Sequence, residues 1–167
     1  MNAPFTNHRS ELLARHTFRL ATMADADAMI VLSDRFFSDS EMPGYGLSFD
    51  PVCYRDWLER VLPTGRVPHI LAFDAASGEL IGYISYFVER NFTDKPFANM
   101  EKFFVRPDHR RSTAARVLLT LATAAARSDG ASLFLATVNS GIHGGRNVFN
   151  KLGFHETPFS CRFGKEL

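Results

Sequence analysis

The sequence predicts an α/β (α+β) fold in which helices cover both faces of a mixed, mostly antiparallel sheet. Segments of strand length alternate with segments of helical periodicity, and turn residues separate them. One interior segment, Leu80–Val88, is apolar on both faces, as expected of a strand covered on both sides. The chain has 167 residues, 46% of them hydrophobic, which is enough for one domain with a sizeable core.

The first part of the chain should form one strand and two helices. A short strand is expected over residues 16–20, and Thr22 followed by Asp25 is typical of a helix start. Glycine and proline residues should end that helix within the segment 38–48. A second helix is expected over residues 50–62, because it opens with Asp-Pro and is followed by Pro and Gly.

The middle of the chain should form a hairpin and then a central strand. Strands are expected over residues 67–73 and 79–89, since the five residues between them suit a turn. Pro96 leads into a further strand that should end near Arg106, because Pro107 cannot continue a ladder. A long helix rich in alanine and leucine follows, and Asp129-Gly130 should end it.

The start of this long helix has the features of a phosphate site. The backbone N–H groups in the first turn of a helix lack partners and attract anions. Small side chains let a ligand approach the backbone, and two arginines stand at the rim of this turn. The residues predicted to form the site are Arg110, Arg111, Ser112, Thr113, Ala114 and Ala115.

Residues 105–119 resemble the acyl-coenzyme A binding motif of the Gcn5-related N-acetyltransferase (GNAT) family. That motif reads Arg or Gln, two residues, Gly, one residue, then Gly or Ala, at the start of a helix. Arg110 and Ala115 match its ends, and Thr113 stands where the family usually has Gly. The anion site does not depend on that side chain, because backbone N–H groups form it.

Residues 147–154 resemble the late helix of the same family and the Gly-Phe that opens its final hairpin. They follow a segment, 131–138, that reads as a strand, as the family order requires. Phe149 stands where many members carry a tyrosine that protonates the departing thiolate. The resemblance leaves the acid open: Ser140, Tyr86, a water molecule or no group at all could serve.

The resemblance implies transfer of an acetyl or other acyl group from acyl-coenzyme A to a primary amine, directly within a ternary complex. Two neighbouring strands of the family splay apart, and the pantetheine arm of the cofactor enters the gap. Backbone groups of Phe103, Phe104 and Val105 would hold its amides like an extra strand, and N–H groups of residues 111–115 would hold the pyrophosphate. Asn139 could bind the pantetheine or the acceptor, or could equally be a turn residue.

Glu101 is the first candidate for the general base that takes the amine proton. By the period of two residues in a strand, it should share a face with Phe103 and Val105. A carboxylate among phenylalanine side chains can accept a proton near neutral pH, directly or through water. A structural ion pair with a neighbouring Lys or Arg is an equal alternative. Weaker candidates for the base are Glu41, Glu89 and His143.

Two other functional classes remain open. The absent tyrosine at Phe149 makes a catalytically silent acyl-coenzyme A binding module the main alternative. A nucleic-acid-binding protein is disfavoured, because the net charge is only +1. The acceptor is a small-molecule or peptide amine of unknown identity, and the segment 38–49 should shape its pocket. A homodimer is possible, and no sequence feature decides it.

Composition also allows expectations about where the protein is located and whether it binds a metal. We expect a cytoplasmic protein without a membrane segment, with residues 1–15 as a flexible tail and 16–167 as one domain. Cys53 and Cys161 lack metal-ligand spacing. The six histidines are scattered, with no His-x-x-x-His pair, so no metal site is expected.

Overall fold

The computed structural model describes residues 15–40, 42–90, 94–137 and 148–155. They contain a five-stranded sheet in the order β1-β2-β3-β4-β5. The first four strands pair antiparallel with their neighbours, and β5 pairs parallel with β4, which confirms the predicted mixed, mostly antiparallel sheet. The strands are β1 (His16–Leu20), β2 (His69–Asp74), β3 (Leu80–Glu89), β4 (Phe97–Val105) and β5 (Leu133–Leu135).

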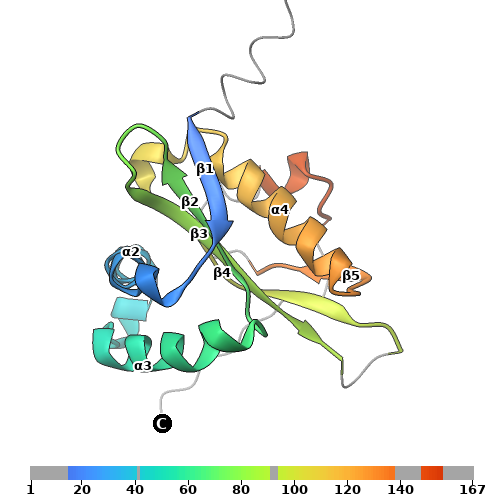
Figure 1. The fold of residues 1–167 in the computed structure, drawn as a ribbon, viewed down its shortest axis with the longest axis horizontal. Coiled ribbons are helices and arrows are strands. Elements are labelled where there is room, and N and C mark those ends of the chain that lie inside the picture. The colour runs from blue at the N-terminus through green and yellow to red at the C-terminus, as the bar shows by residue number, and fades with distance from the viewer. Residues whose placement is uncertain (1–14, 41, 91–93, 138–147, 156–167) are drawn as a thin grey trace, which may run out of the picture.

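Helices cover both faces of the sheet, as predicted. Helices α2 (Ala26–Ser38) and α3 (Pro51–Val61) lie on one face, and α4 (Ala114–Ser128) lies on the other (Figure 1). Each face has its own apolar core: Met29, Leu58 and Tyr83 are fully buried on the α2/α3 side. The α4 side buries Ile81, Ile84, Leu118, Leu119 and Ala122.

Capping explains where the first two helices begin. The Asp25 carboxylate accepts a hydrogen bond from the Thr22 N–H at 2.8 Å, and α2 follows after one turn of 3-10 helix. The Asp50 carboxylate accepts from the N–H groups of Val52 and Cys53 at 2.9 and 3.0 Å. These side chains satisfy N–H groups that the helices themselves cannot pair.

A β-bulge interrupts β4 at Glu101. Tyr86 pairs with Met100, whereas its neighbour Ser85 pairs with Lys102, so Glu101 is the extra residue. After the bulge, Phe103 packs into the core on the α4 side. Glu101 instead lines a pocket on the α2/α3 side. The prediction that Glu101 shares a face with Phe103 was therefore wrong, because the bulge breaks the period of two residues.

The pairing between β4 and β5 is short. It joins only the three residues Phe97, Ala98 and Asn99 to Leu133, Phe134 and Leu135. Among the described residues, no strand pairs with the second half of β4, residues 100–105, on the side away from β3. The pairing of the two strands thus ends at Asn99 and Leu135, and the gap that the resemblance implies would lie beyond this point.

Several predictions concern residues outside the described part of the chain. These are the tail, of which residues 1–14 are not described, the candidate residues Glu41, Asn139, Ser140 and His143, and most of the last segment, 156–167. Within the described ranges, no helix has the length and apolar character needed to cross a membrane.

Gly82 allows a close approach between β3 and β4. A Cβ atom on Gly82 would lie 2.8 Å from the Phe104 carbonyl oxygen and 3.0 Å from Val105 Cγ2. We expect Gly82→Ala to lower the free energy of unfolding by about 1–3 kcal/mol, measured by urea denaturation. Gly44→Ala is the control, since nothing lies within 4 Å of a Cβ there. Equal stability of the two variants would contradict this packing argument.

Candidate functional site

The predicted phosphate loop joins β4 to α4 through a short 3-10 helix, Pro107–His109. The Ser112 N–H donates to the His109 carbonyl at 3.0 Å, and the Ala114 N–H donates to Ser112 Oγ at 3.2 Å. Two of the predicted phosphate donors therefore already have partners within the loop. Among the described residues, no hydrogen bond from the N–H groups of Arg111 or Ala115 is found, so these two are the strongest remaining donors.

The two arginines of the loop differ in their surroundings. Arg110 Nε donates to the Val105 carbonyl at 3.1 Å, and Arg110 Nη2 pairs with Asp39 Oδ2 at 2.9 Å. Its guanidinium also lies 5.6 Å from the centre of the Phe104 ring. Arg111 is exposed and pairs with no described residue. Arg110 thus ties the loop to the end of α2, whereas Arg111 is available to a ligand.

The unpaired half of β4 offers backbone groups to an extended ligand. Phe103, Phe104 and Val105, predicted to bind pantetheine, all lie in this half. The ring of Phe103 packs edge-on against Phe149 at 6.0 Å, and the ring of Phe104 packs against Phe36 at 5.6 Å on the other face. Core packing on both faces holds the strand in place, and no strand of the described part of the chain covers this edge.

Glu101 is held by two neighbours. The buried Ser85 hydroxyl donates to Glu101 Oε2 at 3.1 Å, and Lys102 Nζ lies 3.5 Å from Glu101 Oε1. The side chain of Glu101 is 27% exposed. The ion pair that the sequence left open is therefore present, together with a hydrogen bond that orients the carboxylate toward the pocket.

That pocket has a volume of about 300 Å³ and lies between α3, the loop before it and β4. Its walls combine aromatic rings with carboxylates. The Lys102 ammonium lies 4.4 Å from the centre of the Trp57 ring and 4.8 Å from that of Tyr54, so the aromatic wall already binds a cation. The lining residues are Phe37, Ser48, Phe49, Asp50, Cys53, Tyr54, Trp57, Glu101 and Lys102.

The segment 38–49, predicted to shape an acceptor pocket, contributes Ser48 and Phe49 to this pocket, whereas the contributions of α3 and of Lys102 were not predicted. Tyr54 and Trp57 are three residues apart on a helix, a spacing that brings two side chains to one face. From this spacing, the sequence could have predicted that the two rings line the same surface. Lys102 could not be found in the same way, because the bulge decides which side of β4 it faces.

The structure describes Phe149, which stands at the tyrosine position of the family, and Tyr86, one of the candidates for the acid at the thiolate. Phe149 is 6% exposed and packs against Phe154 at 5.1 Å between ring centres, so it fills core space. The Tyr86 hydroxyl donates to Asp129 Oδ2 at 2.9 Å. Burial, together with this hydrogen bond, raises the pKa of Tyr86. Tyr86 is therefore a poor proton donor near neutral pH.

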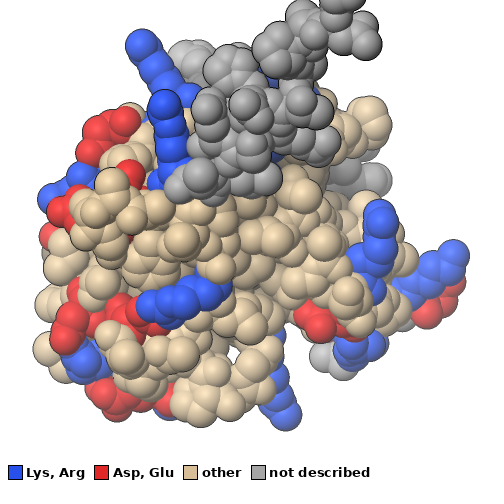
Figure 2. Space-filling model, turned by 45° about the horizontal axis from the view of Figure 1, so that its top comes forward, with Lys and Arg blue, Asp and Glu red and all other residues tan. Residues whose placement is uncertain are grey.

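Charge on the visible surface is mixed. Figure 2 shows Lys and Arg side chains interspersed with Asp and Glu around the edge of a largely uncharged face. The described part of that face therefore carries no continuous basic surface of the kind that contacts a nucleic-acid backbone.

Comparison with known families agrees with this architecture. The model of the acetyltransferase (GNAT) family matches residues 33–154, and the chain therefore belongs to the GNAT acetyltransferases. The matched range includes the open half of β4, the phosphate loop and Phe149. None of the curated proteins compared with the chain matches it.

Solved structures with the same fold include several acetyltransferases. A probable acetyltransferase is 20% identical with a TM-score of 0.74, covering 90% of this chain and 97% of its own. The aminoglycoside 6'-N-acetyltransferase AAC(6')-Ih of Acinetobacter baumannii is 17% identical with a TM-score of 0.71, covering 91% and 99%. AAC(6')-Iy, solved with the bisubstrate analogue CoA-S-monomethyl-acetylneamine, is 17% identical with a TM-score of 0.73 and the same coverage. At these identities the likeness concerns the fold.

The two loop arginines should separate stability from ligand binding. Arg110→Ala removes the contacts to Asp39 and Val105 and should lower Tm by about 2–4 °C. Arg111→Ala should leave Tm unchanged, yet weaken acetyl-coenzyme A binding in calorimetric titration. Arg127→Ala, an exposed arginine at the other end of α4, is the control. Full cofactor affinity in Arg111→Ala would remove Arg111 from the phosphate site.

Proposed function

We propose that the protein is an N-acyltransferase that transfers an acetyl or related acyl group from acyl-coenzyme A to a primary amine. The observation that carries this proposal is the position of Glu101. It lies at the bulge, where the open edge of β4 begins, and its carboxylate faces the aromatic pocket. A thioester lying along that edge and an amine in that pocket would meet beside Glu101.

The proposed cofactor site uses the backbone of Phe103, Phe104 and Val105 for the pantetheine amides. The N–H groups of Arg111 and Ala115 and the Arg111 guanidinium would bind the pyrophosphate, with the helix dipole of α4 adding to the attraction. Ser112, Thr113 and Ala114 complete the loop, and Arg110 positions it. Asn139 remains a candidate for a further contact.

In the proposed reaction, the amine attacks the thioester carbonyl while Glu101, directly or through water, takes the amine proton. A bond forms between nitrogen and the acyl carbon, and the carbon–sulfur bond then breaks. Ser85 holds the carboxylate at 3.1 Å. Because Phe149 has no hydroxyl, the thiolate leaves without a tyrosine donor there and takes its proton from solvent, which balances the proton held by Glu101.

The pocket favours a small cationic amine as the acceptor. Asp50 and Glu101 supply two negative charges against the one positive charge of Lys102, and the rings of Tyr54 and Trp57 attract an ammonium, as their contact with Lys102 illustrates. The neighbour AAC(6')-Ih is named an aminoglycoside 6'-N-acetyltransferase, and AAC(6')-Iy was solved with the bisubstrate analogue CoA-S-monomethyl-acetylneamine. The reacting ammonium must first lose one proton, which passes to solvent, and Glu101 takes the second proton of the resulting amine during the attack.

The alternative is a silent acyl-coenzyme A binding module, which the buried Phe149 favours. Both functions require cofactor binding, but only the enzyme releases free coenzyme A continuously. The two functions are distinguished by incubating the protein with acetyl-coenzyme A and a series of cationic amines, and measuring the released coenzyme A with a thiol reagent. Binding of acetyl-coenzyme A without release of thiol above its spontaneous hydrolysis would support the module.

Glu101→Gln tests the base. The amide keeps the shape and can still accept from Ser85, but it cannot take a proton. We expect kcat to fall by about 10²–10⁴-fold, with unchanged affinity for acetyl-coenzyme A in calorimetric titration. Glu59→Gln, an exposed residue of α3 that does not line the aromatic pocket, is the matched control. A variant that keeps the full kcat at neutral pH would rule out Glu101 as the base.

Asp50→Asn tests the charge of the acceptor. Asparagine can still cap α3 but removes the negative charge from the pocket rim. The KM of a cationic amine should rise about two- to fivefold, since the charge is exposed and screened, and the KM of acetyl-coenzyme A should stay constant. Asp56→Asn, exposed on α3 outside this pocket, serves as the control. An unchanged amine KM would exclude Asp50 from acceptor binding.

A further inference from the structure

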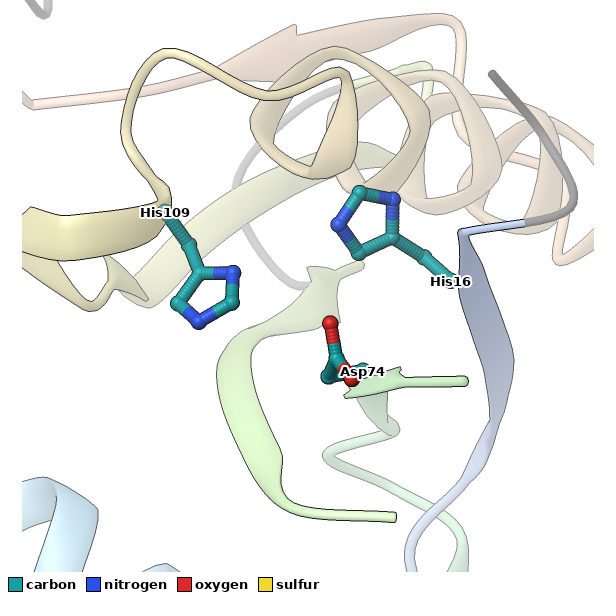
Figure 3. A group of neighbouring side chains, drawn as sticks. All are labelled: His16, Asp74 and His109. Carbon is teal, nitrogen blue, oxygen red and sulfur yellow. The ribbon is translucent and has the colours of Figure 1, made fainter. Parts of the chain in front are cut away.

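Two histidines and one aspartate from three separate segments meet beside the phosphate loop. His16 opens β1, Asp74 ends β2, and His109 ends the 3-10 helix that precedes Arg110. One ligand atom of each residue lies within 4.8 Å of the corresponding atoms of the other two. In Figure 3, a nitrogen of each ring and one carboxylate oxygen turn toward the space between them.

These three atoms are spaced too widely for hydrogen bonds with one another, but closely enough to surround an ion. Among the described interactions, neither histidine forms a hydrogen bond or an ion pair with Asp74. A triangle with no side longer than 4.8 Å has a point within about 2.8 Å of all three corners. Zinc binds histidine nitrogen at about 2.0–2.1 Å, so side-chain rotations that move each atom by less than about 1 Å would complete the shell.

Two of the three side chains are oriented by outer contacts. Asp74 Oδ1 accepts from the N–H groups of Ala76 and Ser77 at 3.0 and 2.9 Å and from the Ser77 hydroxyl at 3.2 Å. The second oxygen of Asp74 is thereby directed toward the histidines (Figure 3). His109 Nε2 lies 3.7 Å from Asp108 Oδ2, an arrangement that leaves Nδ1 for a metal.

His16 is only 7% exposed, and one of its ring nitrogens faces the group. Its Nδ1 is buried and has no hydrogen-bond partner among the described residues. A histidine ligates a metal through a neutral ring nitrogen. The positive charge of Arg15, which acts on His16, weakens the attraction for any cation at this group.

We propose that His16, Asp74 and His109 bind one divalent transition-metal ion. Two imidazoles and one carboxylate are a ligand set that zinc accepts, with the fourth position left to water. The ion would fasten the 3-10 helix 107–109 to the first two strands, directly before Arg110. The site is separate from Glu101 and the aromatic pocket, so the proposal does not depend on the acyltransferase reaction.

The test uses full-length, tag-free protein treated with a chelator and then titrated with Zn²⁺ alone in a calorimeter. We expect about one ion per chain and a rise of Tm with Zn²⁺ concentration. His109→Asn and Asp74→Asn should each weaken binding at least about tenfold and remove the rise of Tm. Asparagine at position 74 can retain the turn hydrogen bonds through its own oxygen.

His155→Asn is the matched control, because His155 is exposed and lies outside the group. Circular dichroism checks that each variant is folded. If either His109→Asn or Asp74→Asn does not fold, the Zn²⁺ affinity of the folded variant tests the proposal. Absence of Zn²⁺ binding to the wild-type protein at millimolar concentration would overturn the proposal. Binding that is equally strong in both folded variants and the control would overturn it too, since the ion would then lie elsewhere.

Discussion

The arrangement of β4 is the constraint on which the rest of this structure depends. Its backbone pairs with β3 along its whole length but with β5 over only three residues. Backbone N–H and C=O groups need partners, so the open edge of residues 100–105 is suited to an extended ligand with amides of its own. The core on each face holds that edge in place, through Phe103 on one side and Phe104 on the other.

The bulge at Glu101 links this edge to the pocket on the α2/α3 side. One extra residue changes the face to which a carboxylate is directed, and Ser85 then fixes its orientation. Without the bulge, Glu101 would point into an apolar core, where burial of an unpaired charge is costly. In the proposed reaction, this is the place where an acyl group and an amine would meet.

The chain departs from the family pattern at Thr113 and at Phe149, and the two departures differ in their consequences. Thr113 precedes the first residue of α4, where the attraction for an anion comes from backbone N–H groups. Phe149 matters more for chemistry, since it packs against Phe103 and Phe154 and offers no proton. The proposed metal group lies at the other end of the phosphate loop, where it would stabilise the turn that carries Arg110.

The sequence by itself determined the order of the elements, the strand that ends at Val105 and the helix start after it, because Pro107, Gly130 and the capping residues act locally. The family motifs, also local, lie within that stretch. Only the tertiary structure decided the face of Glu101, the contact of Lys102 with Trp57, and the meeting of His16, Asp74 and His109. Strand register and the packing of distant segments set these positions, and neither is encoded in the spacing of residues along the chain.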